Sequence, residues 1–332
     1  MKYCLIIKLL LILVIPFNAL ADISALKEQY KRPDSIPFPA DNQYSATKAM
    51  LGKMLFFDPR LSKDENLNCS SCHNPSFGWE VPRAKAVGAQ AQELPRHAPT
   101  VLNMAWVEPF FWDGRAATLE EQSLGPIESN VEMNLPIQEA IQRLSKIEGY
   151  RDWFEKAFPS KGISKETISK AIATYERTIV SSQAPFDLWI NGEEDAISDS
   201  AKNGFTLFNG KAQCAACHTG WNFTDNKFHD AGVFDNVDLG RYELTNQEYD
   251  KHAFKTPGLR NINERAPYMH DGSLVSLESV IVHYMSGGMP RPSLSPLMSP
   301  IALNAEEMKD IIEFLHTLTG PAMVVSLPIL PQ

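Results

Sequence analysis

The segment CAACHTGWNFTD, residues 214–225, carries the most specific pattern in this sequence and sets the organisation of the chain. Cys214 and Cys217 stand three positions apart, directly before His218. The segment CSSCHNPSFGW, residues 69–79, repeats that pattern. The sequence has 5 cysteines, and the fifth, Cys4, lies in a segment with the features of an export signal. Every other cysteine therefore belongs to a Cys-x-x-Cys-His motif.

Three chemistries use such a pair of cysteines. A redox dithiol usually follows a strand in an α/β pattern and needs no histidine, whereas two Cys-x-x-Cys pairs could supply four thiolates to zinc. Cys-x-x-Cys-His is the standard pattern for covalent haem, because the two vinyl groups and the iron belong to one rigid ring. Two complete copies without a spare cysteine favour two covalently bound haem c groups. Their attachment residues are Cys69, Cys72 and His73 for the first, and Cys214, Cys217 and His218 for the second.

The N-terminal segment MKYCLIIKLLLILVIPFNALA, residues 1–21, predicts a secretory signal peptide. Lys2 and Lys8 accompany an apolar run, and Ala19 and Ala21 form an A-x-A cleavage pattern. The run is short for a membrane span, and an uncleaved anchor is the alternative. Export agrees with haem c, which bacteria attach outside the inner membrane. We therefore predict a periplasmic protein, cleaved after Ala21 and without a membrane span.

The composition is that of a globular protein, with 44% hydrophobic and 21% charged residues, and 332 residues suffice for two domains. The formal net charge is -9, and loss of the two signal-peptide lysines would make it more negative. An acidic surface argues against nucleic acid and against anionic membranes as partners. It would suit a basic electron-donor protein.

A short repeat precedes the two haem motifs. Gly-x-x-Leu-Phe begins at Gly52 and again at Gly204, and each copy reads as a helix that leads to a haem-binding loop. Residues 164–180 and 304–320 also have helical periodicity, with Ser164 and Asn304 as expected N-caps and Gly320 as the expected end of the second.

These features predict an all-α fold of two haem domains with long loops. The polar segment of residues 181–200 contains proline and glycine, so we place the domain junction there. The N-terminal domain is then expected to span residues 22–185 and the C-terminal domain residues 186–332.

Two longer strings carry a family resemblance. FFWDGRAATLEEQSLGPIESNVEM (residues 110–133), FKTPGLRNINERAPYMHDGS (residues 254–273) and the haem motifs together resemble the bacterial dihaem cytochrome c peroxidases, which include the MauG-type enzymes. The resemblance covers residues 37–320. It implies two cytochrome c-like domains, an N-terminal haem that reacts with hydrogen peroxide, and a C-terminal haem that stores or delivers electrons.

The resemblance also assigns roles to single residues. It places Trp112 between the haems as an oxidisable relay, although core packing would otherwise be the simpler reading. It makes Glu132 the distal carboxylate that moves a proton between the peroxide oxygens. Gln122 and Pro126 are expected to shape the same pocket. His270 is expected in the pocket of the second haem.

The sequence departs from the peroxidase pattern at two iron-binding positions. Ala89 stands where peroxidases that need prior reduction carry a distal histidine, so we expect His73 to be the only protein ligand of the first iron. The position of the sixth ligand of the second haem holds Tyr284, as in MauG-type enzymes, with Met285 as its rival. A phenolate favours oxidised iron and a thioether favours reduced iron.

Calcium is a further expectation of the family. Its asparagine ligand is replaced here by His97, and calcium prefers oxygen ligands, which argues against the ion. The remaining family ligands are backbone carbonyls, which map to Arg265 and Pro267 and could persist.

The sequence therefore predicts a periplasmic dihaem peroxidase of the MauG-like branch. Its reductant would be a small cytochrome, a copper protein or the side chains of a protein substrate. The assignment is compatible with a homodimer. The alternative is a dihaem electron carrier without peroxide chemistry, against which Glu132 and the vacant distal position at Ala89 argue.

Overall fold

The computed structural model describes residues 19–234 and 237–332 and is mostly helical, as predicted. The predicted signal peptide lies almost wholly in residues 1–18, outside the described part. Within the described ranges, no helix is both long enough and apolar enough to cross a bilayer. The only named sheet there is a two-stranded antiparallel pair, β1 (Phe228–His229) and β2 (Phe254–Lys255).

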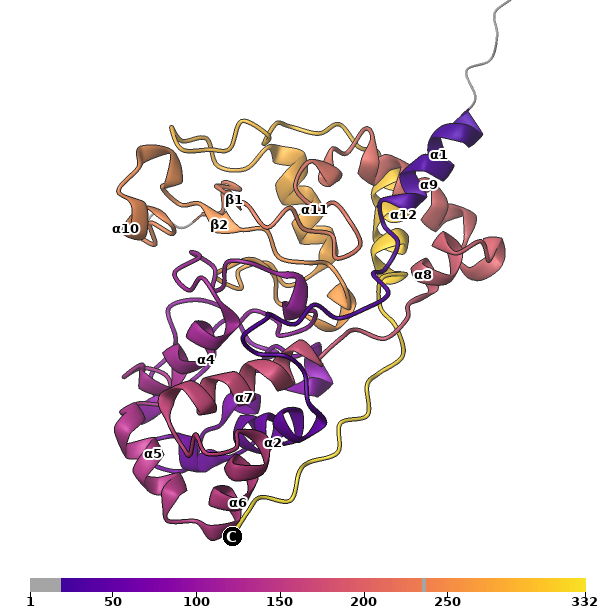
Figure 1. Ribbon diagram of the computed structural model, residues 1–332. Helices are drawn as coiled ribbons and strands as arrows, with labels where there is room; N and C mark the ends of the chain where they lie inside the picture. Colours follow the sequence, from indigo (N-terminus) through magenta and orange to yellow (C-terminus); the bar gives the residue numbers. More distant parts are fainter. Residues whose placement is uncertain (1–18, 235–236) are drawn as a thin grey trace, which may run out of the picture.

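The N-terminal unit consists of five longer helices around one apolar core (Figure 1). These helices are α2 (Ala46–Phe56), α4 (Leu119–Glu128), α5 (Ile137–Ser145), α6 (Glu148–Ala157) and α7 (Lys165–Arg177). The first haem motif forms the one-turn helix α3 (Cys69–Cys72). The predicted cap of α7 is confirmed, because the Ser164 side chain accepts a hydrogen bond from the Thr167 backbone N–H.

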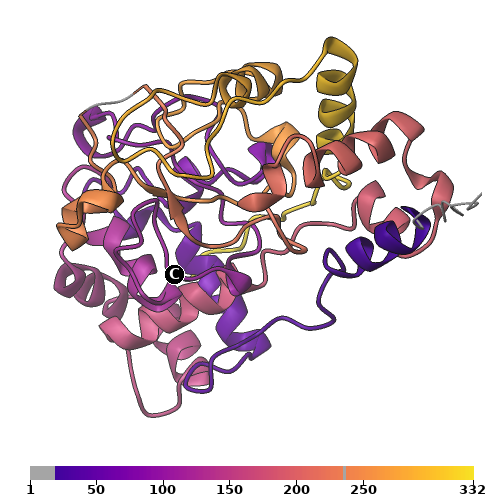
Figure 2. The same ribbon diagram turned by 90° about the horizontal axis from the view of Figure 1, so that it is seen from above.

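The C-terminal unit is built from helices and long loops, and its loops lie over the N-terminal unit when seen from above (Figure 2). Its helices are α8 (Pro185–Ile190), α9 (Asp199–Asn209), α10 (Tyr242–Thr245), α11 (Leu277–Ser286) and α12 (Ala305–His316). Asn304 and Glu307 form the expected capping box of α12. The expected end at Gly320 is wrong, because Thr317 already caps α12.

Short 3-10 turns connect these helices. They are Pro59–Leu61, Pro75–Phe77, Ala89–Ala91, Met104–Trp106, Glu194–Ala196, Cys214–Ala216, Glu248–Asp250 and Ile262–Glu264.

The Gly-x-x-Leu-Phe repeat marks the closest helix crossing in each unit. A Cβ atom on Gly52 of α2 would lie 1.9 Å from the carbonyl oxygen of Ala171 on α7. A Cβ atom on Gly204 of α9 would lie 1.9 Å from the carbonyl oxygen of Asp310 on α12. Both glycines therefore let one helix backbone touch another, which a side chain would prevent. The two units share a plan, as the repeat predicted.

A second repeat, which sequence reasoning missed, has a constant spacing. Helix α4 runs from residue 119 to 128 and α11 from 277 to 286, so both ends are 158 positions apart. The bridge between Phe110 and Ala116 recurs with the same offset between Tyr268 and Leu274. At this offset Trp112 corresponds to His270, and Pro126 corresponds to Tyr284.

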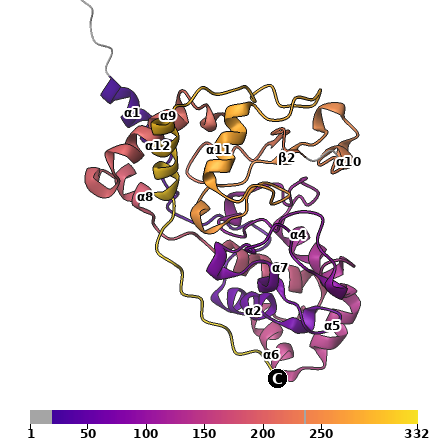
Figure 3. The same ribbon diagram turned by 180° about the vertical axis from the view of Figure 1, so that it is seen from behind.

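The terminal segments cross between the units. Helix α1 (Ala19–Glu28) lies beside α8 and α9, and Tyr30 belongs to the C-terminal core, where its hydroxyl donates to Asn209 Oδ1 at 2.6 Å (Figures 1 and 3). The C-terminal tail runs back to α6, where the Gly149 N–H donates to the carbonyl oxygen of Gln332 at 3.0 Å. Each unit is thus covered by a segment from the far end of the chain.

The polar segment of residues 181–200 contains more buried structure than its composition suggests. Phe186, Trp189 and Ile190 of α8 enter the C-terminal core. Residues 186–190 therefore pack with the C-terminal unit. The boundary between residues 185 and 186 remains a prediction.

We predict that Gly204→Ala destabilises the protein by about 1–3 kcal/mol, because the added methyl group must push α9 away from α12. Thr206→Ala is the matched control, since Thr206 is exposed on the same helix. Urea unfolding of the full haem-loaded protein, followed by circular dichroism, measures both changes. Equal stability of the two variants would contradict the close crossing.

Candidate active site

The first cavity lies in the N-terminal unit and brings together the residues that the sequence predicted. Cys72 and His73 line it, and so do Trp112, Gln122, Pro126 and Glu132. The arrangement places the expected distal residues and the first haem motif around one space.

The second cavity lies in the C-terminal unit. Cys214, Cys217 and His218 line it together with Tyr284 and His270. Trp112 lines both cavities. Arg265 also lines both, whereas Glu132 lines the first alone.

Both motif histidines are held in the orientation that a metal ligand requires. His73 Nδ1 lies 3.4 Å from the carbonyl oxygen of Trp79, and His218 Nδ1 lies 2.9 Å from that of Phe223. Burial lowers the pKa of each imidazole, which favours the neutral ring. A neutral ring that donates from Nδ1 presents the lone pair of Nε2 to a metal.

The cysteines do not fit a redox dithiol or a shared zinc site. Burial raises the pKa of Cys72 to about 11 and that of Cys214 to about 12, so neither is a ready thiolate. Among the described residues, one group of three potential metal ligands converges, Cys217 with Asp225 and His229, and it contains a single cysteine. The four cysteines therefore do not share one ion.

The donor sets fit covalent haem. The first cavity is lined by Cys72 and His73 and the second by Cys214, Cys217 and His218. All four motif cysteines are free thiols, and each histidine has a fixed orientation. The two motif segments are held apart in separate units, so each can carry its own ring. Cys69, Cys72 and His73 would hold one haem, and Cys214, Cys217 and His218 the other.

Glu132 is a buried carboxyl group in the first cavity. Burial raises its pKa, while the nearby Arg115 and a hydrogen bond from Ser129 oppose that shift. The backbone of Glu132 is held by the loop that contains Ala89, because the Ala89 N–H donates a hydrogen bond to the Glu132 carbonyl oxygen at 2.7 Å. A Cβ atom on Gly88 would lie 2.0 Å from the carbonyl oxygen of Val131, so this loop packs directly on the Glu132 segment.

The same loop contains Ala89, the position where peroxidases that need prior reduction carry a distal histidine. Ala89 is buried and is not part of the cavity lining. His97, the nearest histidine on the loop, has Nε2 3.1 Å from Glu80 Oε2 and Nδ1 3.1 Å from the carbonyl oxygen of Arg83. Both ring nitrogens are thus engaged with protein groups.

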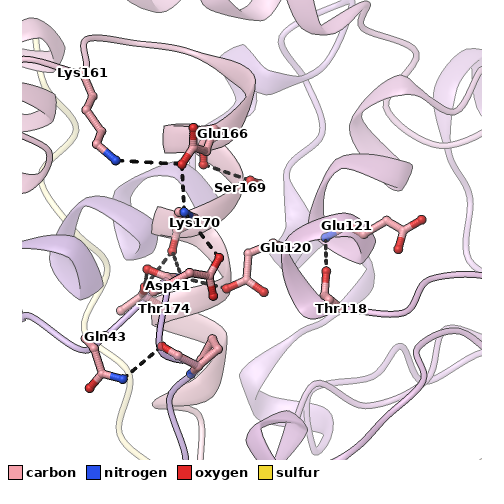
Figure 4. A network of polar contacts seen from close by, with 12 residues as sticks. Asp41, Gln43, Thr118, Glu120, Glu121, Lys161, Glu166, Ser169, Lys170 and Thr174 are labelled. Atoms are coloured by element: carbon pink, nitrogen blue, oxygen red, sulfur yellow. Dashed lines mark hydrogen bonds and ion pairs between the residues drawn. The ribbon is translucent and has the colours of Figure 1, made fainter.

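Helix α4, which carries Gln122 and Pro126, is anchored at its first turn. The Thr118 Oγ1 atom accepts a hydrogen bond from the Glu121 N–H at 3.1 Å (Figure 4). Glu120 is paired with Arg177 of α7 at 2.6 Å, and Lys170, also on α7, bonds Glu166 and lies near Asp41 (Figure 4). Of these contacts, the pair of Glu120 with Arg177 holds α4 against α7.

Tyr284 and Met285 point to different surroundings. Tyr284 lines the second cavity with His218, whereas Met285 packs against the C-terminal apolar core. Burial raises the pKa of the Tyr284 hydroxyl, so a phenolate there requires a nearby positive charge such as iron. Tyr284 also occupies the position that corresponds to Pro126 in the first cavity.

Trp112 is fixed from two sides at the boundary of the units. Its Nε1–H donates to the carbonyl oxygen of His97 at 2.8 Å, and its own carbonyl oxygen accepts from the Lys255 N–H at 2.8 Å. The rings of Trp112 and His270 lie 6.5 Å apart. His270 in turn stacks on Phe254, with ring centroids 3.6 Å apart.

Sequence reasoning missed two charged residues at this boundary, Lys255 and Glu80, and also the role of the Arg265 side chain. Lys255 lines both cavities, and burial lowers its pKa to about 8. Glu80 and Arg265 form a buried ion pair at 2.8 Å, although Arg265 was expected only as a source of a backbone carbonyl. Lys255 and Arg265 stand in the family-specific string of residues 254–273, which was the available signal for them.

The expected calcium ligands do not form a fitting set. His97 offers nitrogen atoms in place of an asparagine oxygen, and both are engaged. Its carbonyl oxygen accepts from Trp112, and the guanidinium of Arg265 lies beside Glu80 in the same region. Pro267 lines the second cavity. Nitrogen donors and a buried cation are unfavourable for calcium.

Two cavities in one chain, each lined by residues of one haem c motif, define a dihaem c-type cytochrome. Trp112 lines both cavities, and Glu132 lines the first alone. The family model described as di-haem cytochrome c peroxidase matches residues 46–195, and the cytochrome c model matches residues 201–319.

Comparisons with individual proteins agree. The methylamine utilization protein MauG of Methylorubrum extorquens is 47% identical over 313 residues, 93% of this chain and 89% of that protein. The cytochrome c551 peroxidase of Pseudomonas aeruginosa is 35% identical, over 94% of this chain and 91% of that protein. A solved MauG-like protein associated with microbial copper homeostasis is 32% identical, with a TM-score of 0.81 and coverage of 88% and 95%.

The chain belongs to the di-haem cytochrome c peroxidase family, which includes MauG. It is a dihaem peroxidase with two cytochrome c-like domains and two covalently bound haem c groups.

We predict that Arg115→Gln moves the acid limb of the peroxidase pH profile to higher pH. A glutamate base works when ionised, so activity falls as the pH drops through its pKa. Burial raises the pKa of Glu132 and Arg115 opposes this, so loss of Arg115 raises the pKa further. Measurement of kcat/KM against pH checks the shift, with the exposed Arg151→Gln as control. An acid limb that stays in place would separate Glu132 from the rate-limiting proton transfer.

Proposed function

We propose that this protein is a MauG-like periplasmic enzyme in which hydrogen peroxide reacts in the first cavity and oxidising equivalents reach the second. When bound, the haems supply the iron redox chemistry that cleaves the O–O bond and stores electrons. Two electrons and two protons convert hydrogen peroxide to two waters. The electrons come from a donor protein or from the side chains of a protein substrate.

The observation that carries the MauG-like assignment is the position of Tyr284. Tyr284 faces the cavity that contains His218, while Met285 is taken up by the apolar core. Two neighbouring residues on a helix point about 100° apart, so the geometry offers one of them to the cavity. Tyr284 is therefore the proposed sixth ligand of the second iron, and its anionic oxygen would stabilise the oxidised state.

Glu132 is the proposed proton carrier for peroxide cleavage. Its carboxylate takes the proton of the iron-facing peroxide oxygen and returns it to the leaving oxygen as water forms. A raised pKa suits both roles, because the same group must accept and then release a proton. Gln122 lines the same cavity and can hydrogen-bond the peroxide. Pro126 in α4 leaves the opposing wall without a ligand atom.

Trp112 is the proposed electron relay. Its indole lines both cavities and is held by a hydrogen bond from Nε1–H to the backbone of His97. An indole that is fixed between two redox centres can be oxidised and reduced in turn, and so can pass electrons from one haem pocket to the other.

A simple dihaem electron carrier is the less favoured alternative. A carrier would be expected to hold both irons six-coordinate through protein ligands, and the first cavity brings Glu132, Gln122 and Pro126 there instead. The negative net charge of -9 supports a basic donor, such as a small cytochrome or a copper protein. Export by the predicted signal peptide would place the enzyme in the periplasm, and a homodimer remains a prediction.

We predict that the as-isolated diferric protein reacts with hydrogen peroxide without prior reduction. Glu132→Gln should slow that reaction by about 10²–10⁴-fold, because the proton carrier is lost. Stopped-flow optical spectra measure the rate, and Glu128→Gln serves as a control on the exposed end of α4. A diferric protein that is inert until one electron is added would show that a protein group caps the first iron.

We predict that Tyr284→Met raises the reduction potential of the second haem, because a thioether stabilises reduced iron and a phenolate stabilises oxidised iron. Met285→Leu should leave this potential almost unchanged. Spectroelectrochemical titration resolves the two haems. The reverse pattern, with an effect of Met285→Leu and none of Tyr284→Phe, would move the protein to the methionine-ligated branch.

A further inference from the structure

His97 is one of the residues that line both haem cavities. Its side chain is 3% exposed. Its backbone N–H donates to the carbonyl oxygen of His270 at 2.7 Å, and its carbonyl oxygen accepts from Trp112 Nε1–H at 2.8 Å. Trp112 belongs to the N-terminal unit and His270 to the C-terminal unit. The backbone of His97 therefore bonds the indole of Trp112 in one unit and the backbone of His270 in the other.

The His97 imidazole is bonded on both sides to acceptors. Nε2 lies 3.1 Å from Glu80 Oε2, and Nδ1 lies 3.1 Å from the carbonyl oxygen of Arg83 and 3.2 Å from that of Ala84. Both ring nitrogens of His97 are therefore engaged with oxygen atoms of the protein and are not open to a metal ion.

Glu80 connects this ring to the C-terminal unit. It is 4% exposed, and its Oε1 accepts from Arg265 Nε at 2.8 Å and from the Thr100 N–H at 3.0 Å. The same guanidinium donates through Nη1 to the carbonyl oxygens of Gly258 and Arg260, at 2.7 and 3.1 Å. Each charge in this group is paired, which offsets the cost of its burial.

The backbone near Glu80 is shaped to admit the arginine. Gly78 has a φ of +57°, in the left-handed region, and a Cβ atom there would lie 2.4 Å from Arg265 Cγ. A side chain at this position would meet both backbone strain and the arginine stem. The close approach shows that the Arg265 side chain is a built part of the boundary between the units.

We propose that His97, Glu80 and Arg265 form a metal-free clamp, which takes the place of the calcium ion that the family resemblance implies between the haems. The clamp bridges the two units and sets the orientation of Trp112 through the backbone of His97. The guanidinium of Arg265 repels a divalent ion from this position, and both ring nitrogens of His97 are already engaged with oxygen atoms of the protein. The nitrogen atoms of His97 also lack the oxygen chemistry that calcium needs. The proposal concerns metal content and does not depend on the identity of the electron donor.

The first test uses the unaltered haem-loaded protein. Elemental analysis after gel filtration should find substoichiometric calcium, and incubation with EGTA should leave the optical and EPR spectra of both haems unchanged. One tightly held calcium per protein would overturn the clamp. So would an EGTA-induced spectral change that added calcium reverses.

The second test removes the ring. His97→Asn should release Glu80 and alter the EPR signals of both haems together, because Trp112 and His270 are both held by the backbone of this residue. His316→Asn makes the same change at an exposed position on α12 and should give wild-type spectra. Unchanged signals from both haems in His97→Asn would overturn the positioning role. If His97→Asn fails to fold, the EGTA test on the unaltered protein still decides the proposal.

Discussion

The constraint on which the rest of the structure depends is that each unit must enclose a large rigid ring with few helices. Because the haem cavity interrupts the apolar core of each unit, one close helix crossing holds the helices of that unit together. The crossings of α2 with α7 and of α9 with α12 are tight enough that a single methyl group at Gly52 or Gly204 would collide with a backbone carbonyl. Each haem motif follows shortly after the helix that carries the glycine, since α2 ends at Phe56 and α9 at Asn209. The crossing therefore fixes the helices around the cavity and also the start of the segment that holds the haem.

The constant spacing of 158 positions between α4 and α11 shows how one plan supports two different pockets. The scaffold is the same, while the residues at equivalent positions differ in chemistry. Pro126 corresponds to Tyr284, so one cavity has a wall without a ligand atom and the other has a phenol. Trp112 corresponds to His270, and these two rings face each other across the boundary, 6.5 Å apart. Substitutions at a few repeated positions would thus account for the proposed division between a reactive pocket and an electron-storing pocket.

Much of the site could be predicted because its chemistry depends on local spacing. Cys-x-x-Cys-His identified Cys214, Cys217 and His218 without tertiary information, and family-specific strings located Trp112 and Glu132. Other features depend on contacts between distant segments, which local patterns do not contain. Nothing near Tyr30 in the sequence indicates that it enters the C-terminal core, and α8 looked like a polar junction although its aromatic residues are buried. The ion pair of Glu80 with Arg265 joins residues far apart in the chain, so the sequence offered a charged residue but not its partner.

The proposed electron route through Trp112 requires the two units to keep one relative position, and the structure supplies several independent restraints on that position. Arg96 bonds both Asp113, next to Trp112, and Asp238 from the loop before α10, so a charge network closes one side of the boundary. Lys255 fixes the backbone of Trp112 and donates through Nζ to the carbonyl oxygen of Pro109. The two terminal segments also tie the units together, because α1 packs on the C-terminal unit and the C-terminal tail packs on the N-terminal unit. Displacement of one unit would break buried ion pairs as well as apolar packing, and buried charges that lose their partners are costly. The orientation of the Trp112 indole therefore depends on the whole boundary between the units. His97 connects these restraints to the indole through the hydrogen bond that its carbonyl oxygen accepts.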